Sequence, residues 1–423
     1  MSEAFLYYLW QFQQFDKLNL KTITGENIIV LKTGILNTDA GPDFTNARLQ
    51  INEIEWVGNV EIHIKSSDWK LHKHQQNEAY NNVILHVVWE NDQSIIRQDG
   101  SLIPTLELKS ITDIFLFEKY KYLVDNQLII PCKEHFSNVS DLSKFAVLDK
   151  VLAKRLQQKA QIVEEIFEQN NGDWEETAYQ FLAKNFGFKL NSDTFLRLSQ
   201  NLPLKILQKH RDNLFQIETM LFGQAGLLEM ADEYSEKMIK EYDFLATKFS
   251  LKENRLKPQE WKFLRTRPAN FPTIRLSQFA QLITQQQSFF SLFTQTETIE
   301  NLRNVLKIEQ SSYWQTHYHF GKLASKPSQG LGVDSINNIL INTVIPLLAF
   351  YSQKTNNHHF MDRCVQFLEA LPAEKNHITD TWETLGLVIK TAFDSQASIE
   401  LFNNFCTQKK CLQCSVGIEI LKK

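Results

Sequence analysis

The segment NVEIHIK, at residues 59–65, carries three ionisable side chains at a spacing that could support hydrolysis. Apolar and polar residues alternate strictly through it. Successive side chains of a strand point to opposite faces, so Glu61, His63 and Lys65 would share one face. A carboxylate, an imidazole and an amine in one row can bind a cation, transfer a proton and orient water.

A second carboxylate precedes this row in the chain. The turn DAGP at 39–42 would place Asp43 at the start of the strand 44–51. If that strand pairs with 55–65 as a hairpin, Asp43 comes close to Glu61. Paired carboxylates supply the oxygen ligands that magnesium and manganese prefer, so these two residues are predicted to hold a metal ion.

The four residues together predict a catalytic site. Asp43 and Glu61 would hold the metal, and His63 or Lys65 would activate the attacking water. The metal would stabilise the charge that develops on a phosphoryl oxygen. This chemistry predicts a metal-dependent nuclease or phosphodiesterase.

Further candidate side chains surround the same hairpin, and they leave two other functions open. They are Asp39, Asp68, His72, His74 and His86. With His63, the last three could ligate zinc in a hydrolase that acts on a small molecule. Alternatively, the row is the solvated face of an antiparallel sheet, His72 and His74 are exposed loop residues, and His86 is a hydrogen-bonded core histidine. A non-catalytic interaction or scaffold protein would present such a face to a protein partner, which the sequence does not identify.

Three cysteines near the end of the chain suggest a second metal site. Cys406, Cys411 and Cys414 supply three thiolates, and zinc or an iron–sulfur cluster needs a fourth ligand. Cys132 is the first choice for that ligand and Cys364 the second. The alternative is a terminal helix with ordinary reduced cysteines.

A basic, turn-rich segment could bind substrate phosphate. RTRPANFPTIR contains Arg265, Arg267 and Arg275, and Thr273 is predicted to cap a helix that begins near Ile274. Arg267 and Arg275 are therefore candidate substrate-binding residues. Solvent-facing or salt-bridged arginines are the alternative explanation.

Composition indicates a folded cytoplasmic protein of about two or three domains. The 423 residues are 43% hydrophobic and 22% charged. Five cysteines in so long a chain do not make a disulfide scaffold, which favours a reducing compartment. The amino terminus lacks the features of a signal peptide, and apolar runs such as 339–350 fall short of the roughly 20 residues that span a bilayer. Net charge is −4, and residues 1–110 are the acidic part, with nine basic and 14 acidic residues.

The periodicity predicts an α+β protein. After a helix at the amino terminus, strands are expected at 27–32, 44–51, 55–65, 82–90 and 102–108. From about residue 111 the pattern becomes helical, with runs at 148–169, 174–186, 214–228 and 337–351. We therefore predict a β-rich α/β catalytic domain over 1–130 and a helical domain over 131–423 that positions substrate.

The run from Thr38 to Glu90, with TDAGPDFTNA, GNVEIHIKSSDW and NVILHVVWEND, resembles an uncharacterised bacterial family known only as a domain of unknown function. The resemblance extends over nearly the whole chain, including RPANFPTIR and CTQKKCLQC, and implies no activity.

More remotely, residues 38–90 resemble the PD-(D/E)XK nuclease superfamily, which implies a restriction-endonuclease-like domain and a nucleic-acid substrate. Pro42-Asp43 matches its Pro-Asp element, and Glu61 matches the second acid. His63 stands where lysine is expected, and Lys65 follows on the same face, so either residue could take the lysine role. One early and three late cysteines are similar to the iron–sulfur staple of RecB-type nucleases, at a different spacing.

Overall fold

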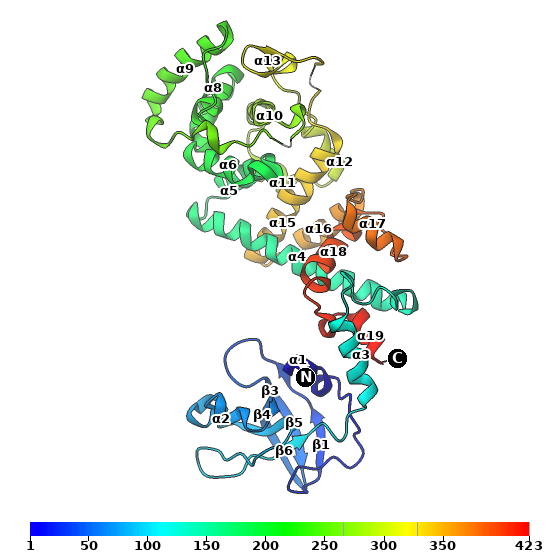
Figure 1. Ribbon diagram of the computed structural model, residues 1–423. Coiled ribbons are helices and arrows are strands. Elements are labelled where there is room, and N and C mark those ends of the chain that lie inside the picture. Colours follow the sequence, from blue (N-terminus) through cyan, green and yellow to red (C-terminus); the bar gives the residue numbers. More distant parts are fainter. Residues whose placement is uncertain (265, 328, 423) are drawn as a thin grey trace. The chain divides into compact units, whose positions relative to one another are not determined.

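The computed structural model describes residues 1–264, 266–327 and 329–422 (Figure 1). The chain forms two compact units. Unit 1 comprises Met1–Val147 and Leu401–Lys423, and unit 2 comprises Leu148–Glu400. Unit 1 contains a mixed sheet and unit 2 is mostly helical, which confirms the predicted α+β class. The predicted division between residues 130 and 131 stays a prediction.

The sheet of unit 1 has the strand order β1-β3-β4-β5-β6, with the short β2 paired to β3. Strands β1, β3 and β4 are antiparallel, while β5 runs parallel to β4 and β6 runs parallel to β5. Strand β5, which lies between β4 and β6, is apolar along most of its length because both of its faces are covered. All five predicted strands are confirmed. The strands are β1 (Ile28–Lys32), β2 (Ile35–Leu36), β3 (Phe44–Ile51), β4 (Ile54–Lys65), β5 (Val83–Glu90) and β6 (Thr105–Glu107).

An irregularity at the start of β3 sets the register next to the candidate site. The pairing of β3 with β4 shifts between Phe44 and Ala47, and Asn46 takes a left-handed conformation with φ 56°. Beyond the shift, Phe44 pairs with Val60. Asp43 therefore lies next to Glu61, as the hairpin prediction requires.

The predicted amino-terminal helix is confirmed as α1 (Glu3–Gln11), which packs against β4 (Figure 1). Its buried residues include Phe5, Leu9 and Trp10. Tyr7 is less buried than these residues, and its hydroxyl donates to the Asp43 carboxylate. The helix thus covers the sheet and also brings a hydroxyl to the candidate site.

A short crossover joins the parallel strands β4 and β5. It contains α2 (Asp68–Leu71) and the 3-10 turns η1 (His74–Gln76) and η2 (Glu78–Tyr80). Trp69 and Tyr80 anchor it in a small core with Val83, Ile95 and Ile103. The crossover carries two of the candidate histidines, so this anchoring determines where they lie.

The rest of unit 1 combines two segments that are far apart in the sequence. They are connected by hydrogen bonds from Ser140 to Glu419 and from Ser415 Oγ to the carbonyl of Ser143. The carboxyl-terminal residues therefore belong to the same compact unit as the sheet. The elements are α3 (Ile114–Asp125), η3 (Phe136–Asn138), the π-helical η8 (Phe402–Cys406), η9 (Cys411–Gln413) and α19 (Ser415–Lys422).

Unit 2 is built from helices, and the four helical runs predicted from the periodicity are confirmed. Helix α4 (Asp141–Gln169) begins in unit 1. The other helices are α5 (Trp174–Phe186), α6 (Phe188–Asn201), α7 (Leu204–Gln208), α8 (Leu214–Gln224), α9 (Glu233–Phe249), α10 (Pro272–Gln285), α11 (Phe289–Gln295), α12 (Ile299–Val305), α13 (Ser312–Thr316), α14 (Val333–Ile339), the π-helical η7 (Leu340–Val344), α15 (Ile345–Thr355), α16 (His359–Ala370), α17 (His377–Thr384) and α18 (Ala392–Leu401). Shorter elements are η4 (Lys252–Asn254), η5 (Pro258–Glu260), η6 (Pro268–Asn270), β7 (His317–His319) and β8 (Lys322–Leu323).

One helical stretch of unit 2 is longer than its apolar run in the sequence indicated. Val333–Thr355 forms 23 continuous helical residues, because the helix extends beyond the apolar run at 339–350 on both sides. By length and composition alone it is sufficient to cross a membrane. Within the structure 72% of its most apolar window is buried, as in the core helix of a globular unit.

Candidate metal centre

Three histidines converge at the end of β4. His63 lies on the strand, His72 follows α2, and His74 begins η1. One ring nitrogen from each lies within 4.8 Å of the others, and His63 Nε2 is 3.2 Å from His72 Nδ1. Lys73 has a left-handed backbone, with φ 59°, and this reversal allows the residues on both sides of it to face His63.

A carboxylate oxygen joins the three rings. Glu61 Oε1 lies 3.2 Å from His74 Nε2 and 3.6 Å from His63 Nε2. His74 Nε2 is buried and forms no hydrogen bond, so its approach to Glu61 lacks hydrogen-bond geometry. Tetrahedral zinc with ligands at about 2.0–2.1 Å separates neighbouring ligand atoms by about 3.3 Å. The separations of 3.2 Å and 3.6 Å are close to this value, so these atoms could hold a metal ion.

Asp43 holds Glu61 in place. Its backbone N–H donates to Glu61 Oε2 at 3.1 Å, and its own Oδ2 accepts a bond from the Ile62 N–H at 2.9 Å. The Tyr7 hydroxyl donates to Asp43 Oδ1 at 2.7 Å. Both carboxylate oxygens of Asp43 are thus engaged, and Glu61 Oε1 is left facing the histidines.

His86 supports His63 from inside the sheet. It is fully buried on β5, and its Nε2 lies 2.9 Å from His63 Nδ1. If His63 binds a metal through Nε2, its Nδ1 carries the hydrogen and donates to His86, the usual role of a group behind a histidine ligand. Tyr80 stacks on His74 with ring centroids 3.8 Å apart, and Trp69 contacts both His74 and His86.

Burial favours the neutral form of His63, His74 and His86, and neutral imidazole is the form that binds metals. Burial lowers the pKa of His63 to about 2, with further lowering by His86, His74 and His72. Burial also lowers the pKa of His86 to about 3 and lowers the pKa of His74. Burial, with help from the charge of Asp43, raises the pKa of Glu61 to about 9. A cation at this point would offset the cost of ionising that carboxyl.

Two of the predicted side chains do not form the solvated face that was one alternative. Glu61 is 4% exposed and His63 is 1% exposed, because the crossover covers the end of β4. His86 is a hydrogen-bonded core histidine, as expected. His72 is exposed and His74 is only partly covered, so the cluster reaches the surface on the crossover side.

The other candidates near the hairpin have different surroundings. Lys65 is exposed, and its backbone N–H donates to Asp68 Oδ2 at 2.9 Å. The exposed Asp39 donates through its backbone N–H to Asn37 Oδ1 within the preceding turn. The His72 backbone N–H donates to the Asp68 carbonyl at 2.8 Å at the end of α2. In the described parts of the chain, no side-chain hydrogen bond or ion pair links Lys65, Asp68 or Asp39 to the three histidine rings.

The arginine segment lies in unit 2, and Arg265 lies outside the described residues. Arg275 is buried, donates to Gln278 Oε1 and Ser335 Oγ, and lies over the Phe188 ring. With Arg267 it lines a hollow of about 430 Å³. Its hydrogen bonds and ring contact indicate a structural contribution, while phosphate binding there stays a prediction.

The predicted cap of the following helix is wrong. Helix α10 begins at Pro272, and Phe271 is its cap residue. The Thr273 hydroxyl instead donates to the carbonyl of Tyr318 at 2.7 Å. Proline at the first helical position moves the start upstream because its missing N–H needs no partner there.

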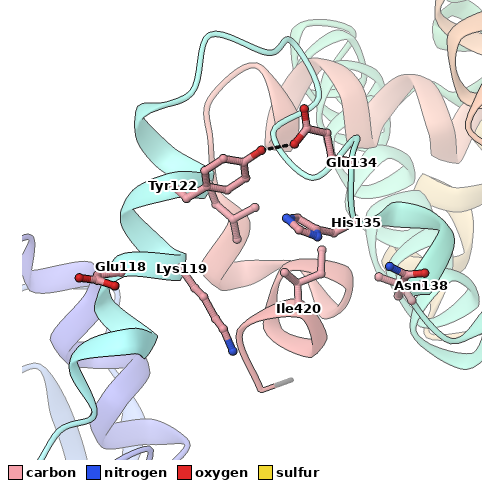
Figure 2. A pocket seen from close by; sticks show the side chains of 9 residues that line it. Glu118, Lys119, Tyr122, Glu134, His135, Asn138 and Ile420 are labelled. Carbon is pink, nitrogen blue, oxygen red and sulfur yellow. Dashed lines mark hydrogen bonds between the residues drawn. The ribbon is translucent and has the colours of Figure 1, made fainter.

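A separate apolar hollow of about 600 Å³ lies in unit 1 (Figure 2). Tyr122 of α3 and Ile420 of α19 line it, together with His135, and the Tyr122 hydroxyl donates to Glu134. None of its lining residues belongs to the histidine cluster. The hollow and the cluster are therefore distinct features of the unit.

Sequence reasoning missed the contribution of α1. Tyr7 bonds to Asp43, and the partly buried Glu3 carries a carboxyl whose pKa is raised by burial and by Asp43. These residues are one helical turn apart, so they share a helix face. Two polar residues at that spacing in an otherwise apolar helix were the available signal.

Comparison with known proteins places the chain at family level. No match is found among curated proteins or among solved structures. The sequence model of a family described as "Protein of unknown function (DUF2851)" matches residues 3–377. That range includes the whole histidine cluster and ends before the three late cysteines. The chain belongs to this family of proteins of unknown function, as the resemblance at the sequence level implied.

Proposed function

We propose that unit 1 is a metal-dependent phosphodiesterase in which His63, His72 and His74 hold one divalent ion and Glu61 takes a proton from the water bound to it. One observation carries this proposal, the close approach of four side chains from residues 61–74. Glu61 Oε1 lies 3.2 Å from His74 Nε2 and 3.6 Å from His63 Nε2. His63 Nε2 lies 3.2 Å from His72 Nδ1. Three histidines with an adjacent carboxylate form the donor set of a catalytic metal site.

The donor set favours zinc or manganese over magnesium, since imidazole nitrogen suits the transition metals and magnesium prefers oxygen. The sequence pattern alone suggested a magnesium or manganese ion shared by Asp43 and Glu61. Both oxygens of Asp43 already accept hydrogen bonds, which supports a positioning role for this residue. Asp43 would keep Glu61 Oε1 directed at the ion.

The ion would lower the pKa of its bound water and polarise a phosphoryl oxygen. Glu61 accepts the proton as the water oxygen forms a bond to phosphorus. The bond from phosphorus to the leaving oxygen breaks, and the proton is returned to that oxygen. The products are a phosphomonoester and an alcohol.

A phosphodiester fits the charges around the cluster. Lys65, Lys70 and Lys73 are exposed along the short segment that carries His72 and His74. These three positive charges lie close together in the sequence of an otherwise acidic amino-terminal region, and they would attract an anionic substrate.

The element order adds support for nucleic acid as that substrate. Helix α1, the β3–β4 hairpin, the crossover and the parallel β5 follow the order of the PD-(D/E)XK core, with Pro42-Asp43 and Glu61 at the acidic positions. His63 takes the lysine position and would bind the ion. We further propose the cytoplasm as the compartment, because five cysteines in a chain of 423 residues do not make a disulfide scaffold.

The test combines metal analysis with hydrolysis by the full-length protein. Wild-type protein loaded with zinc or manganese should cleave bis(p-nitrophenyl) phosphate or one of single-stranded DNA, double-stranded DNA and RNA. Glu61→Gln should keep the ion and lose at least about 100-fold in rate, the usual contribution of a general base. His74→Ala should lose the ion. His358→Ala, at an exposed histidine of unit 2, is the matched control and should change neither property.

Several results would reject this function. Metal binding that survives His74→Ala places the ion elsewhere, and turnover that survives Glu61→Gln excludes that residue as the base. A folded, metal-loaded wild type that cleaves no phosphodiester favours the non-catalytic scaffold. Cleavage at equal trace levels in every variant identifies a contaminant.

A further inference from the structure

Four cysteines of unit 1 gather in its interior although they come from the two separate segments of that unit. Cys132 lies in the turn before η3, Cys406 ends η8, and Cys411 and Cys414 lie at η9. Each is 7% or 8% exposed. Two segments of unit 1 thus bury four thiols, and hydrogen bonds connect these segments.

Hydrogen bonds connect the segment that carries Cys132 with the segment that carries the three late cysteines. The Lys409 ammonium donates to the carbonyls of Asn126, at 2.8 Å, and Val124 at the end of α3. The Asn126 side chain donates in turn to the carbonyl of Pro131, the residue before Cys132, at 3.1 Å. The loop with the late cysteines is therefore tied to the turn that holds the early one.

Close packing also determines where Cys411 lies. A Cβ atom added to Gly417 of α19 would lie 2.2 Å from the Cys411 carbonyl oxygen, so only glycine permits this approach. The short segment that carries Cys411 and Cys414 therefore packs against α19. Unit 1 therefore buries four cysteines from two connected segments, which distinguishes this group from a lone cysteine.

We propose that Cys132, Cys406, Cys411 and Cys414 hold an iron–sulfur cluster. The late cysteines have the spacing C-x4-C-x2-C, which is that of plant-type iron–sulfur proteins, with the fourth ligand here upstream. The proposal uses residues outside the histidine cluster and does not depend on the phosphodiesterase activity.

A cluster fits these four thiols better than a single zinc ion does. Tetrahedral zinc with Zn–S bonds of about 2.3 Å needs sulfurs about 3.8 Å apart. In the described residues, the group of ligand atoms within 4.8 Å of one another consists of His63, His72 and His74 and does not include these sulfurs. A cluster accepts wider separations because different sulfurs bind different iron atoms. The Lys409 ammonium, in the same loop, adds positive charge near Cys411.

The experiment measures iron and acid-labile sulfide on the full-length protein, purified without oxygen and reconstituted with ferrous iron and sulfide. Wild-type protein should bind both and show the visible absorption of a thiolate-bound cluster. Cys411→Ser should lose iron, sulfide and absorption. Cys364→Ser is the matched control, because this buried thiol of unit 2 donates to the carbonyl of Ile345 and should leave the cluster intact.

Two further measurements keep the result interpretable. Circular dichroism should show that Cys411→Ser remains folded, and limited proteolysis should then cleave its carboxyl-terminal segment faster than that of the wild type. If Cys411→Ser does not fold, Cys414→Ser replaces it. Glu61→Gln should keep the cluster, which separates this proposal from the hydrolase. Zinc without sulfide, no metal in the wild type, or a cluster retained in both serine variants would overturn the assignment.

Discussion

The position of Glu61 depends on a chain of hydrogen bonds that begins at Tyr7. The Tyr7 hydroxyl donates to Asp43 Oδ1, and the Asp43 backbone donates to Glu61 Oε2. Burial of these groups makes each bond matter, since an acceptor that loses its donor away from water is not compensated. The geometry of the candidate site therefore depends on individual hydrogen bonds, each of which a single substitution can remove.

Tyr7→Phe should therefore weaken both stability and function. Removing the hydroxyl leaves Asp43 short of one donor, and we expect the free energy of unfolding to fall by about 1–2 kcal/mol. Hydrolysis should fall as well because Glu61 is held less firmly. Urea unfolding and the phosphodiesterase assay measure the two effects.

Tyr8→Phe is the control one residue away. The Tyr8 hydroxyl is buried and has no hydrogen-bond partner among the residues that the structure describes, so its removal should leave stability unchanged or higher. If the two variants lose equal stability, the bond from Tyr7 to Asp43 contributes nothing specific.

At the scale of elements, the parallel pair β4–β5 brings His63 next to His86. This pairing requires close contact at Gly58, where an added Cβ would lie 2.5 Å from Ile84 Cγ2 and 2.7 Å from the Asn82 carbonyl oxygen. The register of the pair also shifts between Asn59 and Val60. Glycine at position 58 thus lets the two strands approach just before the residues of the site.

Gly58→Ala should force β4 and β5 apart. We expect the free energy of unfolding to fall by about 1–3 kcal/mol, the usual cost of overpacking, and metal affinity to fall with it. Val57→Ala on the same strand, at an exposed position, should change stability by no more than about 0.5 kcal/mol. Calorimetry with and without metal tests both statements. A Gly58→Ala protein as stable as the wild type would show that the strands have room to adjust.

At the scale of the whole molecule, unit 2 contains a buried acid that links its stability to pH. Glu218 of α8 accepts hydrogen bonds from Tyr234, Ser277 and Ser311. Burial raises its pKa from 4.5 to about 7 although these three donors oppose the shift. The folded protein therefore holds a proton that the unfolded chain releases at lower pH.

The sign of the pH dependence follows from this shift. Below pH 4.5 both states are protonated, and between pH 4.5 and about 7 only the folded state keeps the proton. Stability should fall as pH rises through this window, by about 3 kcal/mol in total, and then stay level.

Glu218→Gln should remove this contribution. The difference in unfolding free energy, wild type minus variant, should decrease as pH is raised from 5 to 8 in matched urea titrations. A difference that is constant over this range would mean that Glu218 is already ionised in the folded protein.

The local helices and strands, and the residue types at the candidate site, could be predicted from the amino-acid sequence. Strand 44–51 was predicted with its observed limits because its alternating pattern reflects one buried face. The period of two placed Glu61 and His63 on one face, and the Pro42-Asp43 turn led to Asp43. The family, too, was evident from motifs along the chain. The strand and site predictions follow from short-range periodicity and residue type, whereas the family follows from the resemblance.

The contacts between side chains of distant segments became known from the three-dimensional structure and could not be predicted from the sequence. His72 and His74 return to His63 because the crossover is anchored by Trp69 and Tyr80, and no local pattern encodes that direction. Tyr7 reaches Asp43 because α1 packs on β4, a contact between distant segments. Burial of Glu61 and His63 has the same origin, since coverage of a strand depends on what folds over it. A periodic pattern specifies a face, and packing of distant segments specifies what that face contacts.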